Sequence, residues 1–176
     1  MTVELSNEAM AQMEDGALIE ACFAPLIRAY KEASVQGEGA TAALFGQLSE
    51  GQRALFLVKA YTNHALKSAE ELYWWSAYFM AQPSKWRAIK EAYAFVGDRE
   101  GERFLAEMED KLAARGLRAA DSGGLRASMQ DLDTDEGLRA AMAALHERLR
   151  AGDVGMVRLL AACIRSRPDD FLTELA

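Results

Sequence analysis

The sequence predicts an all-α protein, a multi-helix single domain of orthogonal or bundle-like architecture with about seven to nine helices. Alanine, leucine, glutamate and arginine dominate its 176 residues, while valine and isoleucine are sparse and only three prolines occur. This composition favours helix over sheet. Serine and aspartate recur in helix-capping patterns, and between these caps apolar residues return at steps of three and four, which is the spacing of one helix face.

The N-terminal region predicts three helices separated by glycines. Ser6 can cap a short first helix that ends near Gly16. A second helix is predicted over 17–35, with a kink or a restart at Pro25, because proline removes a backbone donor and crowds the preceding turn. After a glycine-containing loop, residues 40–47 predict a short third helix.

Two capping boxes predict the starts of the next two helices. In the first, Ser49 stands at the N-cap with Gln52 three residues on, and the apolar stripe that follows is Leu55, Val58, Thr62, Ala65 and Leu66. In the second, Ser68 and Glu71 predict a new helix or a bend. We expect this helix to end at Pro83.

Two more helices follow before residue 116. The first is expected to end at Gly97, and its apolar positions are Trp86, Ile89, Tyr93 and Val96. Asp98 is a predicted N-cap for the second, which we expect to stop at Gly116.

The C-terminal region is also predicted to be helical. Asp133 and Glu136 repeat the capping pattern for a helix that we expect to break at Gly152 and Asp153. A further helix is predicted over 154–165. A short terminal helix is expected to carry Phe171, Leu172 and Leu175.

Residues 117–133 are the least regular part of the chain, with room for one helical turn at 125–130. The natural seam is 116–124. We therefore expect a main helical bundle over 1–115 and a C-terminal helical segment over 116–176 that packs on the same core.

Aromatic residues are concentrated in the segment 68–86, which holds two tyrosines, three tryptophans and one phenylalanine in nineteen positions. A capping serine, two glutamates in the first turn and a proline beyond the end predict a helix over 69–81. On a helix, residues 72–80 are apolar nearly all round. A helix of this kind must be covered on every side, by its own chain or by another molecule.

Helical spacing sorts the large side chains of this helix into two faces. One face is predicted to carry Leu72, Ser76 and Phe79. The other is predicted to carry Trp74, Trp75 and Tyr78. Three interpretations stay open: a buried core helix, a surface for a protein partner, and a pocket for a small ligand.

Candidate binding residues follow from this helix and its neighbours. His64 precedes it and lies two turns from Glu71 if the helices are continuous, which is a possible metal or acid–base pair. The predicted pocket or interface residues are Trp74, Trp75, Tyr78, Trp86, His64 and Glu71.

No motif for catalysis, phosphate binding or metal binding is visible. Asp131, Asp133 and Asp135 match the first three positions of a calcium loop, but Glu136 replaces the glycine and Met142 replaces the bidentate carboxylate. We therefore predict no catalytic residue, no metal ligand and no cofactor, and we expect a protein that is not an enzyme.

The charge distribution bears on the partners. The net charge is −7, and residues 1–110 carry 10 basic against 17 acidic side chains, while residues 111–176 carry 10 of each. An acidic surface argues against nucleic-acid binding. Cys22 and Cys163 stand in no metal-ligand spacing, and we find no secretory signal and no membrane span, so we expect a cytoplasmic protein.

Three functional hypotheses follow. The leading one is a cytoplasmic helical protein that acts through protein–protein contacts and forms a homodimer. The second is a helical bundle that binds a small molecule or a metal in an aromatic pocket. The third is an acidic decoy or immunity-type protein that binds a basic partner protein.

Overall fold

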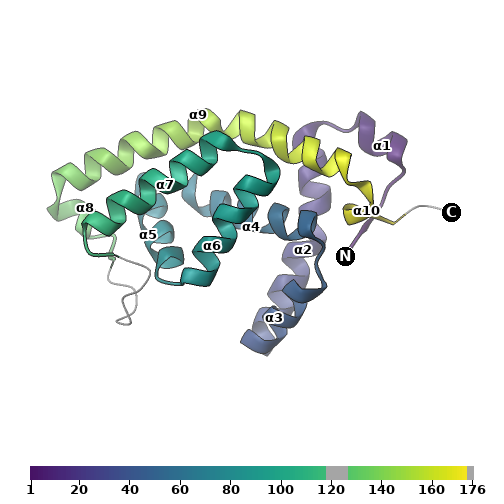
Figure 1. Cartoon of the computed structure of the whole chain (residues 1–176), viewed down its shortest axis with the longest axis horizontal. Coiled ribbons are helices and arrows are strands. Elements are labelled where there is room, and N and C mark those ends of the chain that lie inside the picture. The colour runs from purple at the N-terminus through teal and green to yellow at the C-terminus, as the bar shows by residue number, and fades with distance from the viewer. Residues whose placement is uncertain (118–126, 174–176) are drawn as a thin grey trace. The chain divides into compact units, whose positions relative to one another are not determined.

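The computed structural model describes residues 1–117 and 127–173 and confirms the all-α fold (Figure 1). Within these ranges the chain forms ten helices and one pair of short strands: β1 (Val3–Glu4), α1 (Asn7–Gln12), α2 (Asp15–Gln36), α3 (Glu38–Gln47), α4 (Glu50–Ala65), α5 (Ala69–Met80), α6 (Pro83–Val96), α7 (Arg99–Ala114), α8 (Asp131–Thr134), α9 (Glu136–Ser166), α10 (Pro168–Phe171) and β2 (Leu172–Thr173). Helices α8 and α10 have four residues each. The other eight helices of the described ranges fall within the predicted number of about seven to nine.

The chain divides into two compact units. The first comprises Met1–Lys59 together with Gly155–Ala176, and the second comprises Ala60–Val154. The dividing points fall inside α4 and α9. The predicted seam over 116–124 lies largely outside the described residues, so the domain division drawn there stays a prediction.

In the first unit, α2 packs on α3 and buries one apolar face, formed by Leu18, Ile19, Cys22, Phe23 and Leu26. The predicted capping box at the start of α4 is confirmed. The Ser49 hydroxyl accepts from the Gln52 backbone N–H at 3.1 Å, and the Gln52 side chain accepts from the Ser49 backbone N–H at 3.2 Å.

The C-terminal end of the first unit differs from the prediction of a terminal helix. Helix α10 ends at Phe171, and Leu172 then pairs with Val3 in a parallel two-stranded sheet. The backbone groups of the extended residues Val3 and Glu4 are hydrogen-bonding partners for Leu172 and Thr173. If the helix continued for one more turn, this pairing would not form. Leu175 lies outside the described residues.

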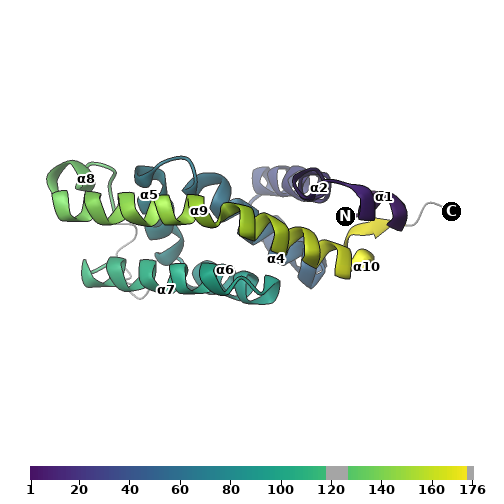
Figure 2. The ribbon, with the colours of Figure 1, turned by 90° about the horizontal axis from the view of Figure 1, so that it is seen from above.

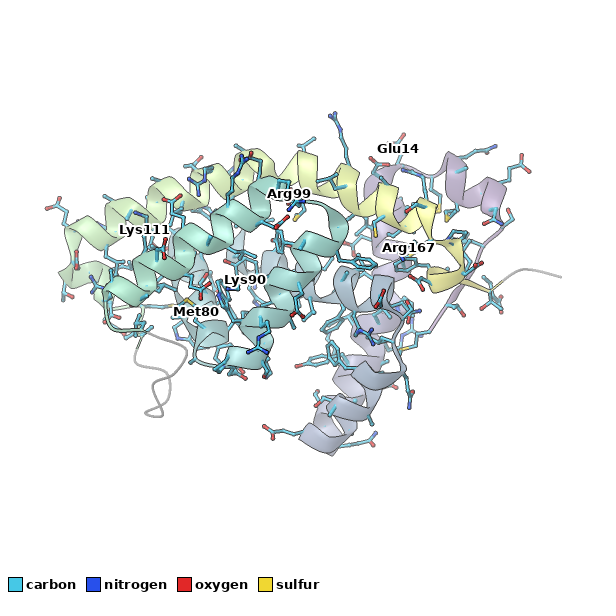
Figure 3. The ribbon with its side chains drawn as sticks, in the orientation of Figure 1. Glu14, Met80, Lys90, Arg99, Lys111 and Arg167 are labelled. Atoms are coloured by element: carbon cyan, nitrogen blue, oxygen red, sulfur yellow. The ribbon has the colours of Figure 1, made fainter. Side chains whose placement is uncertain are left out.

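In the second unit, α5 packs on α6, and α6 packs on α7. Two predicted boundaries are confirmed: Gly97 ends α6 in the left-handed conformation, with φ of 82°, and Asp98 caps α7 by accepting from the Gly101 N–H at 2.9 Å. Lys90 of α6, labelled in Figure 3, forms an ion pair with Glu109 of α7 at 2.6 Å.

Helix α9 corrects two predictions. The break expected at Gly152 and Asp153 is wrong, because α9 continues unbroken from Glu136 to Ser166 (Figure 2). Each glycine costs about 1 kcal/mol in a helix, which tertiary packing can offset. Its N-cap is Asp135, which accepts from the Leu138 N–H at 2.8 Å, and not Asp133, which belongs to α8. The helical turn expected at 125–130 lies partly outside the described residues.

Pro25 does not restart the second helix. Helix α2 runs from Asp15 to Gln36 with the proline inside it. Leu26, directly after the proline, is buried, and Tyr30 packs its ring against Phe45 and Phe56, so apolar contacts within the first unit continue past the proline.

Candidate interaction surface on helix α5

Helix α5 has one buried face and one partly exposed face. The buried face consists of Leu72, Tyr73, Ser76, Ala77 and Met80. The partly exposed face carries four rings, from Trp74, Trp75, Tyr78 and Phe79, which we call the aromatic face. The glutamates of the first turn, Glu70 and Glu71, lie on the same exposed half of the helix.

The local sequence sets this arrangement. The Ser68 hydroxyl accepts from the Glu71 backbone N–H at 3.2 Å, which fixes the start of the helix as predicted. From that start, positions 74, 75, 78 and 79 fall together because residues three and four apart lie on one side of a helix.

Two tyrosine hydroxyls fix the buried face to the core of the second unit. Tyr61, at the end of α4, shares a 2.8 Å hydrogen bond with Ser76, and both side chains are inaccessible to solvent. Tyr73 donates a 2.6 Å hydrogen bond to the carboxylate of Asp131. Burial raises the pKa of both phenols well above the ordinary value.

The rings of the aromatic face contact one another along the helix. Trp74 and Tyr78 are stacked, with centroids 5.3 Å apart and planes within 9° of parallel. Trp75 meets Trp74 and Tyr78 edge-on, at 4.9 and 5.4 Å. Phe79 lies against Trp75 and Tyr78. The result is a rigid aromatic surface with few side-chain rotamers to lose on binding.

His64 and Glu71 hold Trp75 from two sides. The His64 ring stacks on the indole, with centroids 3.8 Å apart, and the indole N–H donates to the Glu71 carboxylate at 2.7 Å. Burial is the main cause that lowers the pKa of His64, followed by the charge of Lys67, and the charge of Glu71 opposes both. The imidazole is therefore neutral at pH 7.

Two polar groups of the aromatic face remain available. The indole N–H of Trp74 and the hydroxyl of Tyr78 form no hydrogen bond with the part of the chain that the structure describes. Exposed rings that keep such polar groups are typical of the side chains that dominate binding energy in protein interfaces.

The structure brings five of the six candidate residues together, namely His64, Glu71, Trp74, Trp75 and Tyr78. The sixth, Trp86, lies elsewhere. It is 2% exposed, and its indole N–H donates to Glu109 of α7 at 3.1 Å. Trp86 therefore belongs to the core of the second unit and adds nothing to the exposed surface.

Phe79 corrects the predicted division of α5 into faces. We expected it on the line of Leu72 and Ser76, yet it is partly exposed and contacts Trp75 and Tyr78. Its position lies half a turn from Glu70 on a helical projection, at the border between the faces. Helical spacing places Phe79 at this border, but it does not tell whether another part of the chain covers the Phe79 ring.

The predicted His64–Glu71 pair does not belong to a larger group of metal-ligating side chains among the described residues. Within residues 1–117 and 127–173, no three His, Cys, Asp or Glu side chains converge to hold a metal ion. The two residues also belong to different helices, since α4 ends at Ala65 and α5 begins at Ala69. Their common neighbour is the indole of Trp75.

Two further findings concern the described part of the chain as a whole. Cys22 and Cys163 are free thiols. None of the helices in the described ranges combines the length and the apolar character that crossing a lipid bilayer requires.

Comparisons with known proteins give no relative: no family model, no curated protein and no solved structure matches this chain.

Proposed function

We propose that this protein acts by binding another protein through the aromatic face of α5, and that it has no catalytic role. The supporting observation is the division of α5 into two faces. One face is fixed in the core by Tyr61 and Asp131, while four rings on the other stay partly exposed. Contiguous exposed apolar surface of this kind marks interaction sites on soluble proteins.

Two occupants were expected from the sequence, a second copy of the chain and a basic partner protein. A second copy would form a homodimer around the rings, as obligate dimer interfaces are rich in aromatic contacts. A basic partner would match the net charge of −7. The proposal includes a cytoplasmic location, which the two free thiols support, because thiols persist in a reducing compartment.

A photo-crosslinking amino acid at position 78 tests the proposal in the cell of origin. Benzoylphenylalanine replaces Tyr78 with a side chain of similar shape, and the same substitution at Arg103 serves as the control. Arg103 lies on α7 in the same unit and is 76% exposed. We expect a discrete adduct from position 78 and none from position 103.

The mass of the adduct identifies the class of partner. An adduct of twice the chain's own mass of 19.3 kDa means a second copy, and any other mass means a different protein. Equal or absent adducts at both positions would contradict the proposal.

A further inference from the structure

Two places in the chain show how it binds a positive charge between a ring and a carboxylate. In the first unit, the Lys59 ammonium lies 5.8 Å from the centroid of Phe23 and 2.8 Å from the Glu20 carboxylate. In the second unit, the Arg148 guanidinium lies 5.6 Å from the centroid of Phe104, and its terminal nitrogen is 2.7 Å from Glu107. In both, the glutamate and the ring lie three residues apart on one helix.

Helix α5 repeats this pattern without the cation. Glu71 precedes Trp74 by three residues, in the same order as Glu20 and Phe23. Tryptophan attracts a cation more strongly than phenylalanine does. Within the described residues, no lysine or arginine lies over the ring of Trp74 or Tyr78.

The charged side chains of α5 itself are complementary to a cation, although Lys67, two residues before the helix, is close enough to His64 to lower its pKa. The exposed half of α5 carries two acidic side chains, Glu70 and Glu71, and no basic one. Glu71 uses one carboxylate oxygen for the indole N–H of Trp75, so its other oxygen can accept a further bond. The ring of Trp74 stacks on that of Tyr78 and meets that of Trp75 edge-on, and the Glu71 carboxylate is bound to this same Trp75.

From these observations we infer that the aromatic face of α5 receives an arginine side chain from a segment of a partner protein. The guanidinium stacks on Trp74 and donates to Glu71. Arginine fits better than lysine, because its planar group stacks on a ring and bonds a carboxylate at the same time. This inference rests on the proposed function and names the chemistry of the partner.

Short peptides test the inference on the full-length protein. The probe is a capped peptide of alanine, serine and glycine with two arginines, and the matched peptide carries citrulline, which keeps the shape and removes the charge. Calorimetry at low salt should show that the arginine peptide binds. The affinity of the citrulline peptide should be lower by at least about tenfold. A lysine peptide should fall between the two.

Variants assign the binding to the proposed residues. Trp74→Leu and Glu71→Gln should each abolish the preference for arginine over citrulline, and Tyr78→Leu serves if Trp74→Leu fails to fold. Glu100→Gln is the control, since Glu100 is an exposed glutamate of α7 whose partner, Arg103, lies on the same helix. It should leave the preference unchanged.

The outcomes separate this inference from the proposed function. Equal binding of the arginine and citrulline peptides overturns the inference and leaves an apolar partner surface. No peptide binding, together with a crosslinked adduct of twice the chain mass, overturns it in favour of a second copy. No peptide binding and no adduct at position 78 contradicts both.

Discussion

The imidazole of His64 lies face to face with the indole of Trp75, with ring centroids 3.8 Å apart and 26° between the planes. This contact joins the end of α4 to the aromatic face of α5. Because Glu71 binds the same indole through its N–H, the orientation of Trp75 depends on one ionisable group on each side. We therefore expect protonation of His64 to disturb the aromatic face through this ring contact.

Acidification should weaken the fold through His64. Burial lowers the pKa of His64 below its ordinary value of 6.5, so the unfolded chain takes up this proton at a higher pH than the folded chain. The contribution of His64 to stability is then complete above pH 6.5 and falls as the pH drops toward the folded pKa. Urea unfolding of the wild type and of His64→Gln across this range measures it. The stability difference should shrink as the pH falls, and a difference that stays constant or grows would refute the assignment.

Tyr73→Phe should destabilise the second unit by about 1.5–3 kcal/mol, the typical cost of losing a hydrogen bond to a charged group. The phenol donates to Asp131 at 2.6 Å, and among the described residues the same oxygen also accepts from the Ser128 backbone N–H at 3.0 Å, a bond that the substitution leaves in place. Tyr78→Phe is the matched control, because the Tyr78 hydroxyl has no bond within the described residues and its loss should cost close to nothing. Equal effects of the two substitutions in urea unfolding would show that the Asp131 bond does not contribute.

Tyr61 and Ser76 should show strong coupling in a double-mutant cycle. Tyr61→Phe leaves the buried Ser76 hydroxyl without its partner, and Ser76→Ala does the same to the phenol, so each single change should cost about 1–3 kcal/mol. The double variant should cost less than the sum, because no buried polar group is left unpaired. Additive costs in urea unfolding would mean that the two hydroxyls do not depend on each other.

Two glycine-to-alanine substitutions in the second unit should act in opposite directions. A Cβ at Gly101 would lie 2.2 Å from the ring of Tyr93, so Gly101→Ala should cost about 1–3 kcal/mol through forced repacking. A Cβ at Gly152, inside α9, would meet nothing within 4 Å, so Gly152→Ala should stabilise by about 0.5–1 kcal/mol. Thermal or urea unfolding decides the sign, and a stabilising Gly101→Ala would contradict the packing described here.

Local chemistry explains why most helix starts could be predicted. Ser6, Ser49, Ser68 and Asp98 each satisfy free backbone N–H groups of the next turn, and all four cap as expected. Long-range effects explain the failures. The pairing of Val3 with Leu172 joins the two ends of the chain, and the continuity of α9 across Gly152 depends on packing that no local window contains.

The candidate surface was only partly predictable for the same reason. Helical spacing separates Trp74, Trp75 and Tyr78 from Leu72 and Ser76, and the structure agrees with that separation. Spacing does not tell which face the chain covers. Trp86 is a candidate because it lies in the aromatic segment 68–86, and spacing assigns Phe79 to the core face, although Trp86 is buried and Phe79 is partly exposed.

Hydroxyl-radical footprinting of the dilute protein, read by mass spectrometry, tests most directly whether the chain leaves the aromatic face of α5 uncovered. Each exposed residue has an internal reference of its own type: Trp74 against Trp86, and Tyr78 against Tyr73. We predict that Trp74 and Tyr78 are oxidised several-fold faster than their buried counterparts. Oxidation of Trp74 and Tyr78 as slow as that of Trp86 and Tyr73, in protein shown by sedimentation to be monomeric, would contradict the account.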